Sequence, residues 1–173
     1  MDRARKVSMA NLPHPAGEQT YIDFAGKYGE YVDRDSGEIQ RVPLLVMTLG
    51  YSQYSYVAAL PSQNSEDLIE GLGQGFGWFG GVTKALIPDN MKTAVVKTDR
   101  YEPGINKVLE DLANHYQTVI LPARPLHPKD KSLVEMSVRE VYRQVLAPLR
   151  NQTFFSLAEL NGAIRRLRRG GLG

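Results

Sequence analysis

Apolar and polar positions along the chain alternate in a way that predicts strands first and helices later. Short apolar runs rich in Val, Ile, Leu and Tyr are typical of strands when turn residues bound them. The predicted strands are residues 21–25, 42–50, 51–60, 84–88 and 118–121, and a hairpin is predicted from residues 30–33 and 38–41. Because short turns join the first three main strands, we expect these to be antiparallel.

Four later segments have the spacing of amphipathic helices. They are residues 64–79, 103–116, 130–149 and 156–169, and the third carries the stripe Val134, Val138, Val141 and Val145. The resulting order, βββαβαβα with a tail helix, predicts an α/β fold with a mixed five-stranded sheet flanked by helices. That is the ribonuclease H-like order.

The first of these helices is unusual because it has glycine at positions 71, 73, 75 and 77. Each glycine costs about 1 kcal/mol relative to alanine inside a helix. A dinucleotide-binding loop should follow a strand and open a helix, whereas this run follows helix-like residues. We therefore interpret the glycines as allowing the helix to pack closely on the sheet.

Composition narrows the class of protein. The 173 residues fit one domain and include no cysteine, which excludes disulfides and thiolate metal sites and is consistent with a reducing cytoplasm. No apolar run reaches the roughly 18 residues of a membrane span, so no membrane partner is expected. We divide the chain into a flexible tail (1–18), a ribonuclease H-like core (19–150) and a basic C-terminal helix or connector (151–173).

Charge is distributed unevenly along the chain. Residues 1–122 contain 11 Lys and Arg against 15 Asp and Glu, and residues 123–173 contain 10 against 4. A basic C-terminal third is typical of a surface that binds a polyanion, although a solvated helix face would look the same.

Three carboxylates occupy distinct local settings. Asp23 lies inside the first strand, Asp89 directly follows the fourth, and Glu135 lies in the first turn of the longest helix. Each has an ordinary alternative: a turn cap near Gly26, an Asx turn at Asp89, and a capping box with Ser132. Together they suit a two-metal phosphoryl-transfer site, since the predicted sheet order would bring them to one edge and Mg²⁺ prefers oxygen ligands.

Four sequence motifs resemble the catalytic core of IstA-type transposases of bacterial insertion sequences, in the retroviral-integrase superfamily. They are Tyr21-Ile22-Asp23-Phe24-Ala25-Gly26, Trp78-Phe79-Gly80-Gly81-Val82, Asp89-Asn90-Met91-Lys92-Thr93-Ala94-Val95 and the segment from Pro128 to Val138. The resemblance covers roughly residues 19–150. Thr83 and Ser132-Leu133 depart from the family pattern, where a Pro and a Gly-Lys pair are expected.

The resemblance implies that Asp23, Asp89 and Glu135 are a DDE triad. It implies two Mg²⁺ or Mn²⁺ ions with DNA bound, processing of transposon 3′ ends and their transfer into target DNA. It also implies a second transposase protomer and an AAA+ helper ATPase as partners. Family members carry a helix-turn-helix region before this core and a small β-domain after it, so we expect an excised catalytic domain.

Four basic residues near the third carboxylate are candidates for contacts with DNA phosphates, because Lys and Arg neutralise the backbone. They are Lys129, Lys131, Arg139 and Arg143. Arg165, Arg166, Arg168 and Arg169 are weaker candidates. Two other functions stay open: a nuclease of the same fold that cannot join strands, and an inactive domain that only binds DNA or assembles.

Overall fold

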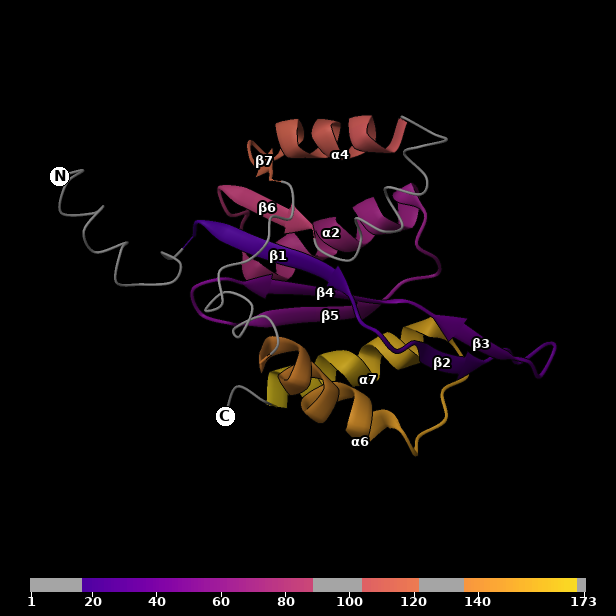
Figure 1. The fold of residues 1–173 in the computed structure, drawn as a ribbon. Coiled ribbons are helices and arrows are strands. Elements are labelled where there is room, and N and C mark those ends of the chain that lie inside the picture. The colour runs from indigo at the N-terminus through magenta and orange to yellow at the C-terminus, as the bar shows by residue number, and fades with distance from the viewer. Residues whose placement is uncertain (1–16, 89–103, 122–135, 171–173) are drawn as a thin grey trace, which may run out of the picture.

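A five-stranded mixed sheet organises the protein (Figure 1). The computed structural model describes residues 17–88, 104–121 and 136–170. The strand order is β5–β4–β1–β6–β7. The bounds are β1 Gln19–Phe24, β4 Leu44–Leu49, β5 Ser55–Ala59, β6 Ala85–Pro88 and β7 Val119–Ile120. Strand β4 is antiparallel to β1 and β5, whereas β6 is parallel to β1 and β7, so the predicted mixed sheet is confirmed.

The predicted hairpin is also confirmed, as a separate two-stranded sheet of β2 (Gly29–Val32) and β3 (Ile39–Val42). Its turn is set by Asp33, whose carboxylate accepts hydrogen bonds from the backbone N–H groups of Ser36 (3.0 Å) and Asp35 (2.8 Å). These bonds lower the pKa of Asp33, because they favour the ionised carboxylate. Gly37 follows at φ 74°, a conformation that a side chain would strain.

The strand predicted over residues 51–60 begins later than expected. Residues 50–52 form a turn, and Gln53 has φ 61° with its side-chain amide donating to the carbonyl of Gly50 at 2.8 Å. Regular pairing therefore starts only at Ser55, opposite Thr48. The tyrosines and valine of this run are compatible with strand and turn alike, so the sequence pattern did not separate them.

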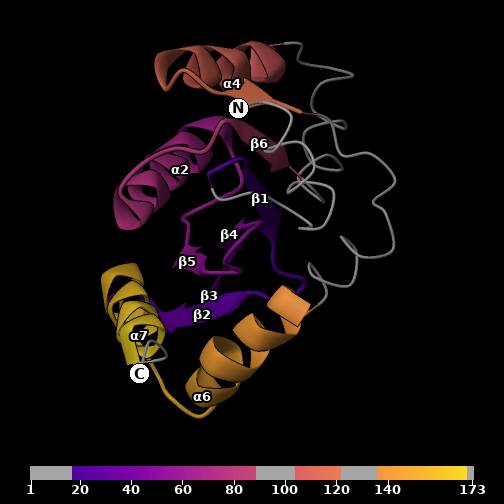
Figure 2. The ribbon, with the colours of Figure 1, turned by 90° about the vertical axis from the view of Figure 1, so that its left-hand side faces the viewer.

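Side chains alternate across the sheet and form a hydrophobic core on each face. One core receives Leu45 and Met47 of β4 and lies beneath α2 (Ser65–Phe79) and α4 (Gly104–His115). The other receives Leu44 and Val46 and lies beneath the C-terminal helices. Figure 2 shows α2 and α6 on opposite sides of the strands.

Helix α2 begins where the side chain of Asn64 accepts a hydrogen bond from the backbone N–H of Asp67 at 2.9 Å. Two of its four glycines lie against the sheet, as predicted: a Cβ at Gly71 would lie 2.7 Å from Leu60 Cδ2, and one at Gly75 would overlap Met47 Sδ. The prediction is wrong for Gly77, where a Cβ would have no atom within 4 Å. Gly71 and Gly75 thus allow the backbone of α2 to approach the strands closely.

The long C-terminal helix changes its winding. Residues 136–141 are α-helical, η1 (Tyr142–Leu146) is π-helical, and α6 (Ala147–Leu149) follows. Pro148 explains the wide turn, because proline has no N–H to donate and its ring would clash with the carbonyl four residues earlier. The predicted start of this helix, residues 130–135, lies outside the described residues.

The last helix, α7 (Leu157–Gly170), packs on the edge strand β5 through Leu160, Ala163 and Ile164. Its Asn161 side chain accepts from the N–H of Ala59 at 2.7 Å and donates to the carbonyl of the same residue at 2.9 Å. These bonds satisfy backbone groups that an edge strand would otherwise leave unpaired.

Candidate active site

Asp23 is the one member of the predicted triad among the described residues. It lies in β1 between Ile22 and Phe24, which both point into the core beneath α2. Asp23 therefore projects from the opposite face, and it is half-buried opposite Val46. An aspartate near the end of a central strand, on one defined face of the sheet, is a suitable position for a metal ligand.

The strand that leads to Asp89 lies beside β1. Strand β6 runs parallel to it, and its last residue, Pro88, is in register with Ile22, the neighbour of Asp23. The first and fourth of the predicted main strands are therefore neighbours, as the ribonuclease H-like order requires. Asp89 itself, the next residue in the sequence, lies outside the described residues.

The helix that follows Glu135 crosses the same face of the sheet as Asp23. The hydroxyl of Ser137 lies 3.0 Å from that of Thr48 and 3.2 Å from that of Ser55. Thr48 is the cross-strand partner of Tyr21, which shares its face with Asp23. Ser137 thus fixes the described start of the helix on this face. Glu135 lies outside the described residues.

This contact corrects the predicted apolar stripe of the helix. Val141 and Val145 are buried as expected, but Val138 is 45% exposed and Ser137 is buried instead. The buried positions therefore step four residues at a time from Ser137. Periodicity missed Ser137 because its partners come from strands more than 80 residues earlier.

The predicted phosphate-binding residues have different surroundings. Arg139 and Arg143 are exposed on the helix, but Arg143 donates to both carboxylate oxygens of Glu140, at 2.8 and 2.9 Å. Part of the charge of Arg143 is therefore already neutralised. Lys129 and Lys131 lie outside the described residues.

Arg168 of α7, named above as a weaker candidate for phosphate contact, is instead buried within the fold, and the sequence did not predict that role. It is only 8% exposed, and its guanidinium donates to the carbonyl of Ser55 at 3.2 Å and to the side-chain oxygen of Gln144 at 2.6 Å. Burial lowers the pKa of Arg168. Gln144 in turn donates to Glu140, so Arg168 links α7, β5 and the helix that follows Glu135. The sequence signal for its burial was its position four residues after Ile164, which places both residues on the same face of the helix.

Within residues 17–88, 104–121 and 136–170, no group of three His, Cys, Asp or Glu side chains could hold a metal ion. Two of the three predicted ligands are not among these residues. The same part of the chain contains no helix long and apolar enough to cross a membrane.

Comparison with solved structures defines the class of this fold. The catalytic core domain of BIV integrase superposes with a TM-score of 0.55, at 11% identity, covering 86% of this chain and 80% of that one. The HTLV-2 integrase catalytic core domain, solved in complex with magnesium, gives a TM-score of 0.56 at 13% identity, with 88% and 83% covered. The chain thus has the ribonuclease H-like fold of integrase catalytic cores.

In sequence, the chain is a homologue of insertion-sequence transposases, which confirms the resemblance inferred from its motifs. It is 44% identical over 154 residues to a protein of Pseudomonas fluorescens named as a putative transposase for insertion sequence IS1162, covering 89% of this chain. It is 34% identical over 112 residues, 65% of this chain, to the IS21 transposase of Pseudomonas aeruginosa. It spans 27% and 29% of these two relatives. No protein-family model matches the chain.

Proposed function

We propose that this chain is the catalytic domain of a DNA transposase in which Asp23, Asp89 and Glu135 form the active site. One arrangement carries the proposal: Asp23 lies on the face that the helix after Glu135 crosses, and the strand leading to Asp89 is the parallel neighbour of β1. Carboxylates from two adjacent strands and one helix would then converge at a single edge.

The donor chemistry fits divalent cations such as Mg²⁺ or Mn²⁺. Asp23 offers hard carboxylate oxygens at a half-buried position, and Asp89 and Glu135 would complete the ligand set. When bound with DNA, two such ions would activate the attacking oxygen and stabilise the leaving oxygen of a phosphodiester. The role of this chain is to hold the three carboxylates in a fixed relation.

The reaction we propose has two steps on DNA. Water attacks a phosphodiester at the transposon end and releases a 3′-hydroxyl, leaving the phosphate on the 5′ end of the flanking strand. This hydroxyl then attacks a phosphodiester of the target, joins to its phosphorus and displaces the 3′ oxygen of the target strand, which leaves as a 3′-hydroxyl. Arg139, Arg143, Lys129 and Lys131 would contact backbone phosphates and position the strands. The network from Arg168 through Gln144 would hold the helix against the sheet while the strands exchange.

The resemblance to IstA-type transposases supports the partners that we propose. The substrates are transposon-end and target DNA. A second transposase protomer would pair the two transposon ends. An AAA+ helper ATPase would act together with the transposase. These assignments are made for a full-length transposase, since the matched relatives are much longer than this chain.

The test is a joining assay in which a pre-cut 3′ end is transferred into a second duplex in the presence of Mg²⁺. Asp89→Asn and Asp23→Asn should abolish joining, because the amide keeps the shape but loses the charge that holds the cation. Asp111→Asn, an exposed acid on α4, is the matched control and should join normally. Circular dichroism checks that each variant is folded.

Three results would contradict the proposal or narrow it. Joining by folded Asp89→Asn would remove that residue from the site. Cutting without joining by the unmodified chain would indicate a nuclease of the same fold. Binding of DNA without cutting or joining would indicate an inactive binding or assembly domain.

A further inference from the structure

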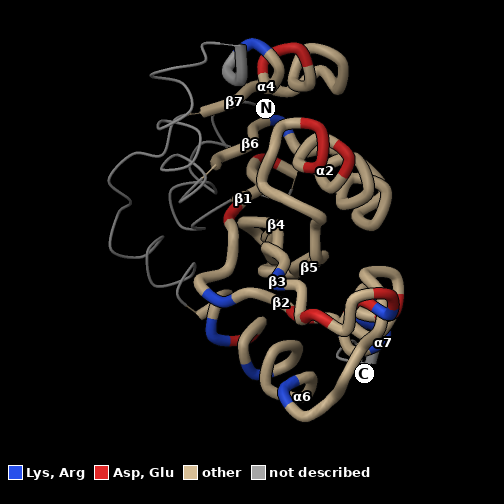
Figure 3. The backbone as a smooth tube through the Cα atoms, turned by 90° about the vertical axis from the view of Figure 1, so that its right-hand side faces the viewer, with Lys and Arg blue, Asp and Glu red and all other residues tan. Residues whose placement is uncertain are grey.

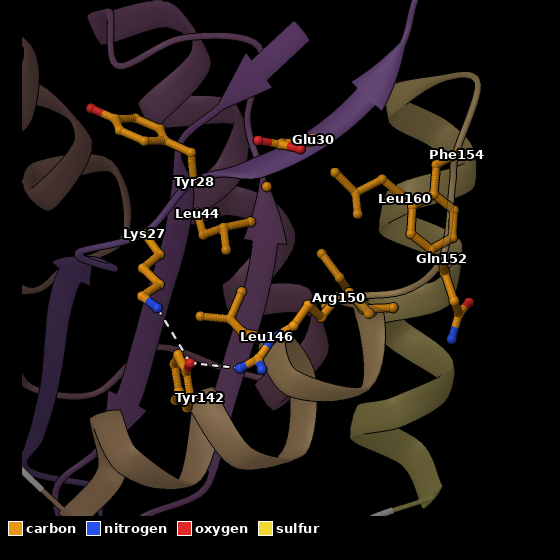
Figure 4. A pocket seen from close by; sticks show the side chains of 13 residues that line it. Lys27, Tyr28, Glu30, Leu44, Tyr142, Leu146, Arg150, Gln152, Phe154 and Leu160 are labelled. Carbon is orange, nitrogen blue, oxygen red and sulfur yellow. Dashed lines mark hydrogen bonds between the residues drawn. The ribbon is translucent and has the colours of Figure 1, made fainter. Parts of the chain in front are cut away.

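A pocket of about 280 Å³ opens between the loop after β1, the helix of η1 and α6, and α7 (Figure 4). Its inner wall is apolar and includes Leu44 and Leu160, which belong to the core of this face. Its mouth carries Lys27, Tyr142 and Arg150. None of these three residues was singled out by the sequence motifs.

The three mouth residues converge on one oxygen. The ammonium group of Lys27 donates to the phenol oxygen of Tyr142 at 3.3 Å, and the guanidinium of Arg150 donates to the same oxygen at 2.8 Å. The ammonium group also lies 4.8 Å from the centre of the Tyr142 ring. Because the phenol oxygen accepts both bonds, its own hydrogen can be donated outward. The mouth therefore presents two cations and a hydroxyl.

The positive charge of this mouth is not neutralised within the described part of the chain. The ion pairs among the described residues join Arg34 to Glu159, Arg41 to Glu30, Lys84 to Glu18 and Arg143 to Glu140, and include neither Lys27 nor Arg150. Glu30, on the rim of the pocket, pairs instead with Arg41 at 3.4 Å. The hydrogen bond from Lys27 and the charge of Arg150 lower the pKa of Tyr142, as expected for a phenol beside excess positive charge.

The mouth of the pocket is formed by segments that also adjoin the candidate active site. Lys27 follows Asp23 by four residues, and Tyr142 belongs to the helix that crosses the Asp23 face. Figure 3 shows Lys and Arg spaced along this helix as far as α6 and in the loop that leads into β2. Since Arg143 is already paired with Glu140, Lys27 and Arg150 are better placed to bind a second anion.

We propose that Lys27, Tyr142 and Arg150 bind a backbone phosphodiester of the DNA substrate, beside the active site. The inference rests on the proposed function. Lys27 and Arg150 are exposed, which suits a phosphate on a polymer that passes across the surface. A phosphodiester has several acceptor oxygens and can accept hydrogen bonds from all three groups at once.

The test measures the affinity of the full chain for a short random-sequence duplex by fluorescence anisotropy over a series of NaCl concentrations. Lys27→Gln and Arg150→Gln should each reduce the slope of log K against log salt by about 0.9, because each removes one phosphate contact. Tyr142→Phe should weaken binding at every salt concentration without changing the slope, because it removes a donor but no charge. Thermal melts verify that the variants fold.

Lys107→Gln is the matched control. It removes an exposed lysine from α4, at the opposite end of the molecule from α6 (Figure 1), and should leave the slope unchanged. Wild-type slopes in Lys27→Gln and Arg150→Gln would overturn the inference. A second result would also overturn it: the wild type binds inorganic phosphate tightly, the variants lose this binding, and their salt slope for DNA is unchanged. The site would then bind a free anion and not DNA. If the wild-type chain still joins DNA strands, the proposed function holds even when either of these results overturns the phosphate site.

Discussion

Gly75 provides a direct test of how closely α2 packs on the sheet. An alanine Cβ at this position would lie 2.2 Å from Met47 Sδ, 2.9 Å from Met47 Cε and 3.0 Å from Tyr56 Cδ1. Met47 is fully buried at 0% exposure, so its thioether cannot move into solvent. Gly75→Ala must therefore shift either this side chain or the helix.

Two effects of opposite sign determine how Gly75→Ala changes the free energy of unfolding. Alanine is favoured over glycine in a helix by about 1 kcal/mol. Inserting a methyl group into a close-packed core costs about 1–3 kcal/mol. We therefore expect Gly75→Ala to lower the free energy of unfolding by up to about 2 kcal/mol.

Gly77 in the same helix is the matched control. A Cβ there would have no atom within 4 Å, so Gly77→Ala should raise the free energy of unfolding by about 0.5–1 kcal/mol. Urea unfolding followed by circular dichroism gives both values, and their difference isolates the cost of packing. In a Met47→Ala background the cost of Gly75→Ala should shrink, because the contacted atoms are gone.

Equal stability of the two alanine variants would refute this account of the helix. An undiminished cost of Gly75→Ala in the Met47→Ala background would show that Met47 is not the cause.

Three further predictions concern the C-terminal helices. Arg168→Ala should lower the free energy of unfolding by about 2–4 kcal/mol, because two charge-assisted hydrogen bonds are lost, whereas the exposed Arg169→Ala should change it little in the same urea titration. Asn161→Ala should cost about 2–3 kcal/mol by leaving backbone groups of β5 unpaired, and a neutral result would contradict the edge contact. Ultraviolet titration should find one tyrosine that ionises below the ordinary pKa of 10.0; it should disappear in Tyr142→Phe and move upward in Lys27→Gln. Because this pKa is lowered by folding, ionisation of Tyr142 favours the folded state as pH rises through it, and that contribution is lost as pH falls.

The sequence alone determined most of the local structure. Short apolar runs bounded by turn residues identified the strands, the hairpin was predicted from residues 30–33 and 38–41, and the first helix was predicted to begin at residue 64, because each depends on neighbours within a few residues. Sheet order followed from the succession of elements and from the family resemblance. Asp23 was identified as a candidate because an aspartate is rare inside a strand.

Tertiary structure decided what depends on residues far apart in the chain. The strand pattern identified β1, but its pairing with β4 and the helix over that face established which side of the sheet Asp23 occupies. In the sequence, Arg168 was one of four arginines named as weaker candidates for phosphate contact, and only the packing of α7 on β5 shows that it is buried. Lys27 and Tyr142 are 115 residues apart, so their contact has no local signature. Such contacts depend on how layers pack, and the period of a single element carries no information about the chemistry of the surface that it meets.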